Sequence, residues 1–323
     1  MDEKQQGEVC PMNPHKSKIG GQALIEGVMM KGAFKGAMAC RLPDGTIDVE
    51  TWDLNAKRPW YRKVPLVRGV YSFIFSMIDG YRCLMKSAEK QMTEEEIEEE
   101  EQNPSALEKW LDEHFTEKTV EAIMIVFMVI SVVFALGMFL FLPKWIVGLI
   151  KPLTSNRILQ SFSEGVIKIV VFIAYMAITG TMKDIRRTYE YHGAEHKTIA
   201  CFEAGLPLTV ENVKKQVRLH PRCGTSFIFL TLFISILAMC LVPFTIPWQR
   251  FLCSFALLPI TVGVSFEAIQ FAGRSNSVIS KIISWPGLQL QRITTKEPDA
   301  SQIECAIAAL TPCIPENLED DKW

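Results

Sequence analysis

The sequence lacks the features that indicate several common protein classes. Its formal net charge is only −2, and its basic residues gather in loops beside apolar segments without forming a separate basic stripe. We therefore expect no nucleic-acid partner. It has no GxxxxGK motif, which argues against a phosphate-binding loop, and no internal repeat of regular period. Nothing in it requires a nucleotide or an organic cofactor.

A secretory signal and a disulfide framework are also missing. The first 20 residues contain no apolar h-region, so we expect no cleaved signal peptide. The nine cysteines are an odd number and include no CxxC pair. This usage favours reduced thiols in contact with the cytosol.

Long apolar runs are present, and they dominate residues 119–272. A helix needs about 20 apolar residues to cross the hydrocarbon core of a bilayer. The alternative, four buried helices of a soluble protein, fits poorly because the first run is too long and too uniformly apolar. The sequence therefore predicts a mainly α-helical, polytopic membrane protein with about four transmembrane helices and a small β-containing N-terminal cytoplasmic region. The four windows that qualify or nearly qualify are Ala122–Leu142, Gly165–Met182, Phe227–Pro247 and Phe251–Ala272.

Lysine and arginine in the loops predict the orientation of these spans. The loop between the first two windows contains only Lys144, Lys151 and Arg157, and the link between the last two contains Arg250 alone. The loop between the second and third windows is strongly basic, with Lys183, Arg186, Arg187, Lys197, Lys214, Lys215, Arg218 and Arg222. We therefore expect both termini in the cytoplasm and the lipid bilayer as the main partner.

The same patterns divide the chain into six parts. We expect a disordered N-terminus over 1–17, a small β-rich cytoplasmic unit over 18–63, an interfacial or re-entrant helix over 64–91, an acidic linker and helix over 92–118, a four-span membrane domain over 119–272 with a cytoplasmic loop over 183–226, and cytoplasmic C-terminal helices over 273–323.

Local signals support the polar parts. Residues 38–52 read as two strands joined by a Pro-Asp-Gly turn, and the glycines before them suggest tight turns or a close backbone approach. Residues 66–91 are apolar on one side but carry charges that interrupt a clean span. An amphipathic helix over Ser275–Ser284 is expected to end at Trp285-Pro286, and a further helix to start at Pro298-Asp299.

The polar loop over 183–226 contains the segment that could carry chemistry. His192 and His196 are four residues apart, so a helix would place both imidazoles on one face. The sequence HGAEH matches H-x-x-E-H, in which two histidines bind Zn²⁺ and the glutamate acts as general base. In that interpretation Glu195 is the catalytic residue. Cys201 lies off the histidine face and is expected to be a packed thiol.

A third metal ligand is required, and three residues are candidates. His220 and Cys223 lie in the HPRCG segment, and Glu267 lies in the fourth apolar window. The five-residue pattern alone is weak, because a helix with two surface histidines would produce it as well. The clustering of His192, His196, His220 and Cys223 within 32 residues favours a metal site.

Three functions remain open on the residues alone. The first is a metal-dependent hydrolase with a cytosol-facing site, which takes a substrate that the sequence does not name. The second is a non-catalytic scaffold or assembly factor with a structural metal. The third is a transporter, for which Lys168, Glu267 and Gln270 are the polar span residues. The sequence specifies no oligomeric state.

Five segments resemble the YqhQ-like family of bacterial membrane proteins: GGQALIEGVMMKG, VPLVRGV, YHGAEHKTIACFEAG, HPRCGTSF and PGLQLQRITTKEP. The resemblance extends over about residues 18–312. That family is described as predicted metal-dependent enzymes of unknown function. It implies a bacterial cytoplasmic-membrane location and a metal, and it carries over to His192, Glu195, His196, His220 and Cys223 as the motif residues.

Overall fold

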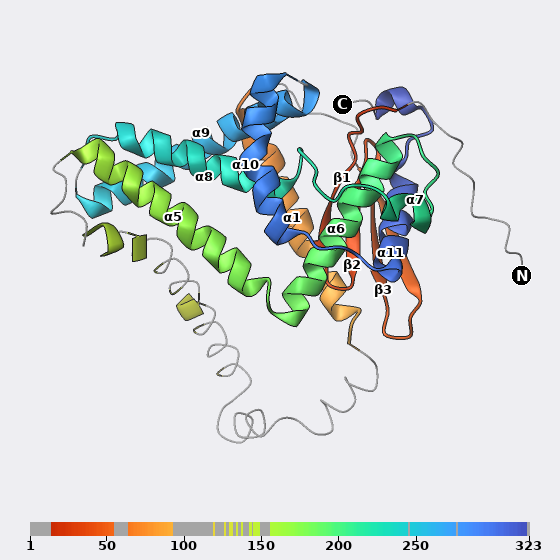
Figure 1. Cartoon of the computed structure of the whole chain (residues 1–323). Coiled ribbons are helices and arrows are strands. Elements are labelled where there is room, and N and C mark those ends of the chain that lie inside the picture. The colour runs from red at the N-terminus through yellow and green to blue at the C-terminus, as the bar shows by residue number, and fades with distance from the viewer. Residues whose placement is uncertain are drawn as a thin grey trace, which may run out of the picture. The chain divides into compact units, whose positions relative to one another are not determined.

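The structure is a computed structural model of the chain. It describes residues 14–54, 64–92, 156–244, 246–275 and 277–321, together with scattered residues between 119 and 148. The chain forms two compact units: residues 1–91, 176–238 and 242–323 make up the larger, and residues 92–175 and 239–241 the smaller. The candidate site lies within the larger unit, and its elements are labelled in Figure 1.

A four-stranded antiparallel sheet lies in the larger unit (Figure 1). Its strands are adjacent in chain order: β1 (Gly20–Leu24), β2 (Gly27–Lys31), β3 (Lys35–Arg41) and β4 (Ile47–Asp53). The expected strand pair is confirmed, because β3 and β4 pair around a turn in which Gly45 has a φ of 86°.

The glycine-rich segment before that pair forms β1 and β2, two strands that the sequence had suggested only as turns or a close approach. The close approach itself is found at Gly21 and Gly27. A Cβ atom at either glycine would lie 2.4 Å from the carbonyl oxygen of the neighbouring strand. A larger side chain at these positions would therefore separate the strands.

Helices cover both faces of the sheet. α6 (Lys183–Glu203) and α11 (Ala300–Leu310) pack on one face, and α1 (Val67–Glu89) packs on the other. The face toward α6 and α11 carries the larger cluster of fully buried side chains. That cluster includes Val28, Met30, Ala37, Ala39, Tyr191, Ala194, Phe202, Ile303, Ala306 and Leu310.

The ends of these helices follow from local signals. α6 ends at Glu203, before Gly205 with its left-handed φ of 69°. α11 begins after Asp299, whose carboxylate accepts from the Gln302 backbone N–H in a capping box. The start of α11 agrees with the helix start predicted at Pro298-Asp299.

The prediction that a helix ends at Trp285-Pro286 is wrong. α10 (Val278–Thr294) begins after the N-cap Ser277 and continues through Pro286 for two more turns. A proline removes its own N–H bond, but contacts beyond it can hold the helix together. Gly287 packs directly against Ser226, and Gln291 is hydrogen-bonded to the loop that precedes α8.

Three described helices are long and apolar enough to cross a membrane: α5 (Arg157–Thr179), α8 (Gly224–Leu241) and α9 (Pro247–Arg274). They correspond to the second, third and fourth predicted windows, with shifted ends. The first window, Ala122–Leu142, lies largely outside the described residues, as does the acidic segment from residue 93 to 118. The predicted count of four spans is therefore not confirmed.

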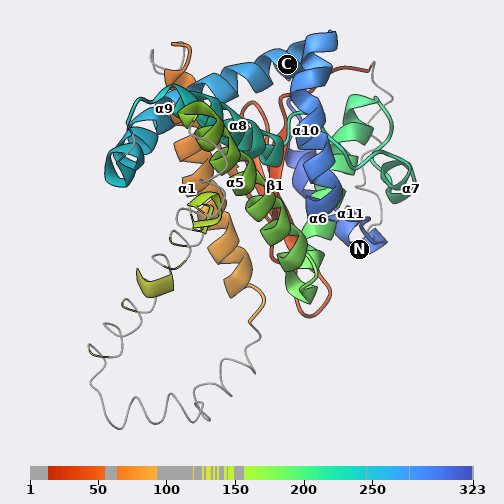
Figure 2. The same cartoon turned by 60° about the vertical axis from the view of Figure 1, so that its left-hand side comes forward.

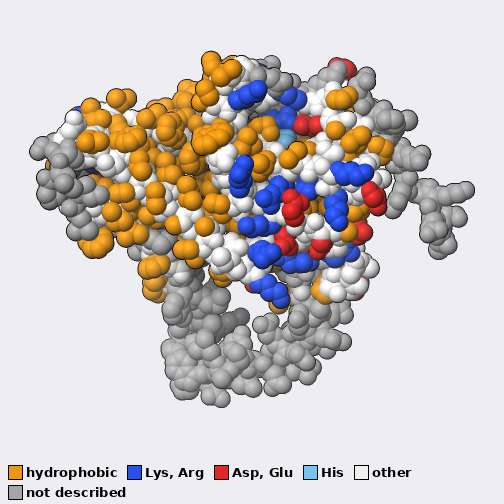
Figure 3. All heavy atoms as spheres, in the orientation of Figure 1, with side chains coloured by type: hydrophobic (Ala, Val, Ile, Leu, Met, Phe, Trp, Pro, Cys, Tyr) orange, Lys and Arg blue, Asp and Glu red, His pale blue; other side chains and the backbone are white. Residues whose placement is uncertain are grey.

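Surface composition separates these helices from the rest. In Figure 3 hydrophobic side chains gather over the apolar helices, whereas Lys, Arg, Asp and Glu side chains gather over α6 and α11. We call the sheet with α6 and α11 the polar part. It also includes the short helices α7 (Val210–Lys214), η3 (Thr311–Cys313) and η4 (Leu318–Asp320).

Residues 14–17, which the sequence predicts to be disordered together with residues 1–13, pack against the polar part. The His15 N–H donates to the Glu203 carbonyl, and Ser17 is fully buried. The partners of this segment lie about 190 to 300 residues away in sequence, which is why local composition gave no sign of the contact. Residues 1–13 lie outside the described range.

Candidate metal centre

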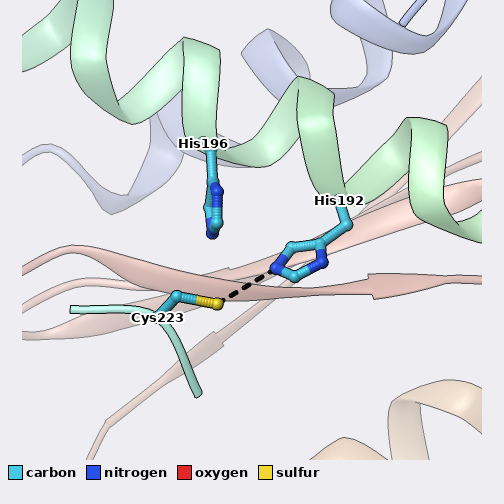
Figure 4. A group of neighbouring side chains, drawn as sticks. All are labelled: His192, His196 and Cys223. Atoms are coloured by element: carbon cyan, nitrogen blue, oxygen red, sulfur yellow. Dashed lines mark hydrogen bonds between the residues drawn. The ribbon is translucent and has the colours of Figure 1, made fainter. Parts of the chain in front are cut away.

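α6 presents His192 and His196 on the same face, as their spacing predicts. Their ring centroids lie 4.4 Å apart in an edge-to-face arrangement. Cys223, the N-cap residue of α8, lies close to them (Figure 4). The three potential ligand atoms, two imidazole nitrogens and one sulfur, all lie within 4.8 Å of one another. This spacing is short enough for a single ion to bind all three.

Backbone carbonyls fix the orientation of both imidazoles. The His192 Nδ1–H donates to the carbonyl of Thr294 at 2.9 Å, and the His196 Nδ1–H donates to the carbonyl of Arg218 at 2.6 Å. Because a carbonyl only accepts, each ring directs its Nε2 to the other side. An imidazole held by its second nitrogen in this way is the usual arrangement of a metal ligand.

The Nε2 atom of His196 is buried and has no hydrogen-bond partner among the described residues. His192 Nε2 lies 3.2 Å from the Cys223 sulfur. A buried polar atom without a partner costs free energy, and a water molecule or a metal ion at that atom would remove the cost. The carbonyl-oriented ring fits a metal ion in that role.

The electrostatics at Cys223 favour the thiolate. Burial alone would raise the pKa of this thiol, but the imidazoles of His192 and His196 outweigh burial and hold the pKa well below its usual range. Burial alone would lower the pKa of His192, yet the facing sulfur raises it to about 9. The position at the N-terminus of α8 further favours negative charge. Thiolate is the form of cysteine that binds metals, and binding at Nε2 requires loss of the His192 proton.

Glu195 is the second buried group with an unpaired atom. Its side chain is buried, and its Oε2 has no partner in the part of the chain that the structure describes. Burial raises the pKa of this carboxyl group, and the nearby imidazoles and the backbone N–H of Gly21 partly offset that rise. A Cβ at Gly21 would lie 3.2 Å from the carboxyl carbon, so only glycine leaves the carboxylate its present room.

Two further contacts assemble the site from distant segments. Gln291, fully buried on α10, bonds both backbone groups of His220 and the hydroxyl of Ser226, which fixes the loop that carries Cys223. Gly193 allows residues 294–298 to approach α6, because a Cβ there would lie 2.0 Å from the Lys296 carbonyl oxygen. The carbonyl of Thr294 is thereby brought to His192.

His220, a candidate ligand, lies next to the three-residue group but is engaged elsewhere. Its ring centroid is 5.7 Å from that of His196. Its Nε2 lies 3.2 Å from the Arg222 guanidinium and 3.6 Å from Glu203. Burial would raise the pKa of Glu203, but His220 and Arg222 lower it to about 2. A fixed guanidinium at Nε2 opposes the approach of a cation, so the structure does not bring His220 into the ligand group.

Glu267, the other candidate, is not brought together with the histidines. It lies on α9, where Arg68 donates to both of its carboxylate oxygens and the Leu66 backbone N–H donates to one of them. Its acceptor capacity is used in this pair. Cys201 is buried and its thiol donates to the Pro207 carbonyl, in agreement with the expected packed thiol.

The residues that orient His192 and His196 could not be recognised from the sequence. The carbonyls of Thr294 and Arg218 are backbone groups, so their side chains gave no signal. Gln291 lies in the segment PGLQLQRITTKEP, which the sequence singled out by resemblance but to which it assigned no role.

Two imidazoles and one cysteine sulfur, close enough together to bind one ion, form a donor set typical of zinc. Three protein ligands with an open position are the pattern of catalytic zinc sites, whereas four protein ligands are typical of structural ones. The described residues supply three ligand atoms in one group.

Comparison with known proteins places the chain among uncharacterised proteins. A family model described as "Protein of unknown function (DUF1385)" matches residues 64–316. The "Uncharacterized protein YqhQ" of Bacillus subtilis (strain 168) is 35% identical over 312 residues, which cover 94% of this chain and 95% of that protein. No solved structure matches the chain.

Proposed function

Since the chain belongs to the DUF1385 family of YqhQ-like proteins, whose function is not established, we propose a function from its own site. The protein is a metal-dependent hydrolase with zinc as the metal. It acts at the cytoplasmic face of a bacterial membrane. His192, His196 and Cys223 are the ligands in this proposal. Glu195 is the general base.

The membrane part of the proposal rests on α5, α8 and α9, each of which has the length and apolarity of a span. The ligand Cys223 directly precedes α8, so the site lies at the end of an apolar helix. The basic loop around α6 favours the cytoplasmic side for this end. A substrate with a membrane-embedded part, such as a lipid-derived molecule or a membrane peptide, is the class that such a location favours.

One observation carries the proposed chemistry: Glu195 Oε2 and His196 Nε2 are both buried and unpaired within the described residues, on adjacent positions of one helix. When bound, a zinc ion acts as a Lewis acid and makes water a nucleophile at neutral pH. Glu195 is suited to take the proton of the attacking water, because burial raises the pKa of its carboxyl group toward the working pH.

A second candidate is a structural metal site in a non-catalytic scaffold. The burial of Cys223 and His196 favours it, since structural sites are closed to solvent. In that case Glu195 would be the fourth ligand. The two functions differ in whether the carboxylate of Glu195 binds the metal or acts on water. For the transporter alternative, the described residues give no support, because Lys168 and Glu267 are both in ion pairs.

The proposed function is tested by metal-dependent hydrolysis. The protein, purified without a histidine tag and reconstituted in lipid nanodiscs, is offered a panel of ester, amide and peptide substrates. We expect cleavage of at least one class, loss of this activity on chelation and its return with added zinc. A panel that shows activity unaffected by complete metal removal would contradict the proposal.

A further inference from the structure

α1 combines two halves of different character. Residues 69–78 are ten consecutive uncharged residues. The second half of the helix, from Asp79 to Glu89, contains four charged residues: Asp79, Arg82, Lys86 and Glu89. At a rise of 1.5 Å per residue, ten residues extend about 15 Å, which is half of a hydrocarbon core about 30 Å thick. The uncharged half is too short to cross a bilayer.

The charged half of α1 is fixed to the polar sheet. Lys31 of β2 donates to Asp79, and Lys86 donates to Glu50 of β4 at 2.7 Å. Gly80 lies directly against Gln22 of β1. These contacts place the second half of the helix beside the sheet.

The uncharged half packs on α9 instead (Figure 2). A Cβ at Gly69 would lie 2.6 Å from Phe266, and a Cβ at Gly263 would lie 2.9 Å from Leu66. Such close packing through glycines is typical of helices within membranes. Gly263 precedes the last residue of α9, Arg274, by eleven positions, so the start of α1 lies about 16 Å along α9 from that end.

An ion pair between Arg68 and Glu267 joins the start of α1 to α9. Arg68 and Glu267 are each only partly exposed, and the guanidinium donates to both carboxylate oxygens. Charged groups within a membrane are paired with one another in this way. The pair neutralises the one charge that the first turns of α1 would carry into the bilayer.

The side of α1 that faces away from α9 is apolar and exposed. Between positions 69 and 78 it carries no charge. α9, against which α1 packs, is itself long and apolar enough to cross a membrane. We call this side the apolar stripe of α1. Its exposed side chains are Val67, Ile74, Phe75, Met77, Ile78 and Tyr81, the last of which follows the first charged residue of the second half, Asp79.

We propose that α1 is a re-entrant helix whose first three turns are inserted into one leaflet of the bilayer, in contact with lipid acyl chains, and whose second half returns to the sheet on the same side. Tyr81 then lies at the headgroup level, where tyrosine is enriched. The Arg68–Glu267 pair fixes the inserted end to α9. This proposal is independent of the metal centre.

The test is site-directed spin labelling of the full chain in lipid nanodiscs, with the unsubstituted chain as the background. Labels are placed at Ile74→Cys and, as matched controls, at Ile228→Cys on α8 and Asp44→Cys in the β3–β4 turn, all three of which are exposed. We expect the label at 74 to resemble that at 228, with frequent oxygen collisions and few collisions with a water-soluble nickel chelate. The label at 44 should show the reverse.

A second labelling experiment tests the re-entrant path. Val64→Cys, before α1, is treated in sealed vesicles of known orientation with a membrane-impermeant maleimide. We expect no reaction from the side opposite to Asp44→Cys. Reaction from that side would show that α1 crosses the bilayer. Nickel-chelate access at 74 would place the stripe in water, and protection from both collision agents would show that protein covers it; each result overturns the proposal.

Discussion

Glu195→Gln is expected to leave the metal bound and to lower hydrolysis by about 10² to 10⁴-fold, the usual contribution of a general base. Glutamine keeps the shape of the side chain and its contact with Gly21, but it cannot take a proton from water. The ligand atoms of His192, His196 and Cys223 remain as they are. The measurement is bound metal per chain together with the turnover number for the substrate class found in nanodiscs.

Glu190→Gln is the matched control for this variant. It introduces the same change on the same helix, where Glu190 accepts a hydrogen bond from Gln302, and it should leave both metal and turnover close to the wild-type values. Loss of the metal from Glu195→Gln would instead identify Glu195 as a fourth ligand and favour the structural function. Full activity in that variant would remove Glu195 from the mechanism.

Replacement of the sulfur should weaken the binding of the metal itself. Cys223→Ser is expected to weaken zinc binding by more than about 100-fold, since loss of a partner that only orients a ligand already costs about 10 to 100-fold. Two imidazoles lower the pKa of the Cys223 thiol and so favour its thiolate form. A serine hydroxyl is not ionised by such neighbours. The affinity is measured by competition with a chromophoric chelator.

Cobalt substitution identifies the sulfur independently. The wild-type protein loaded with Co²⁺ should show thiolate-to-cobalt charge-transfer absorption, and Cys223→Ser should lose it. Cys201→Ser is the control, because that thiol is also buried but donates to the Pro207 carbonyl on another side of α6. Equal spectra of wild type and Cys223→Ser would exclude Cys223 as a ligand.

α6, which carries two candidate ligands, is the part of the site that the sequence predicts well. A spacing of four residues fixes His192 and His196 on one helical face, whatever surrounds the helix. Which of His220 and Cys223 lies beside the histidines was not predictable, because the two are only three residues apart. Tertiary contacts decide it: Arg222 and Glu203 hold His220, whereas Cys223, at the N-cap of α8, lies close to His192.

The fold shows the same division between local and distant causes. The turn at Gly45 and the cap at Asp299 depend on neighbouring residues, and the sequence located both. The continuation of α10 through Pro286 depends on Ser226 and His220, which lie more than 60 positions away. The partner of Glu267, Arg68, is 199 residues distant, so the role of that carboxylate as an ion-pair partner had no local signal.

The metal site is best tested by elemental analysis of the purified protein, prepared without a histidine tag, for the wild type and for the His192→Ala/His196→Ala variant. We expect about one zinc ion per wild-type chain, in keeping with one group of three candidate ligand atoms, and none in the double variant. A wild-type protein that holds no metal even after reconstitution with zinc would contradict it, and HGAEH would then be a structural face of α6.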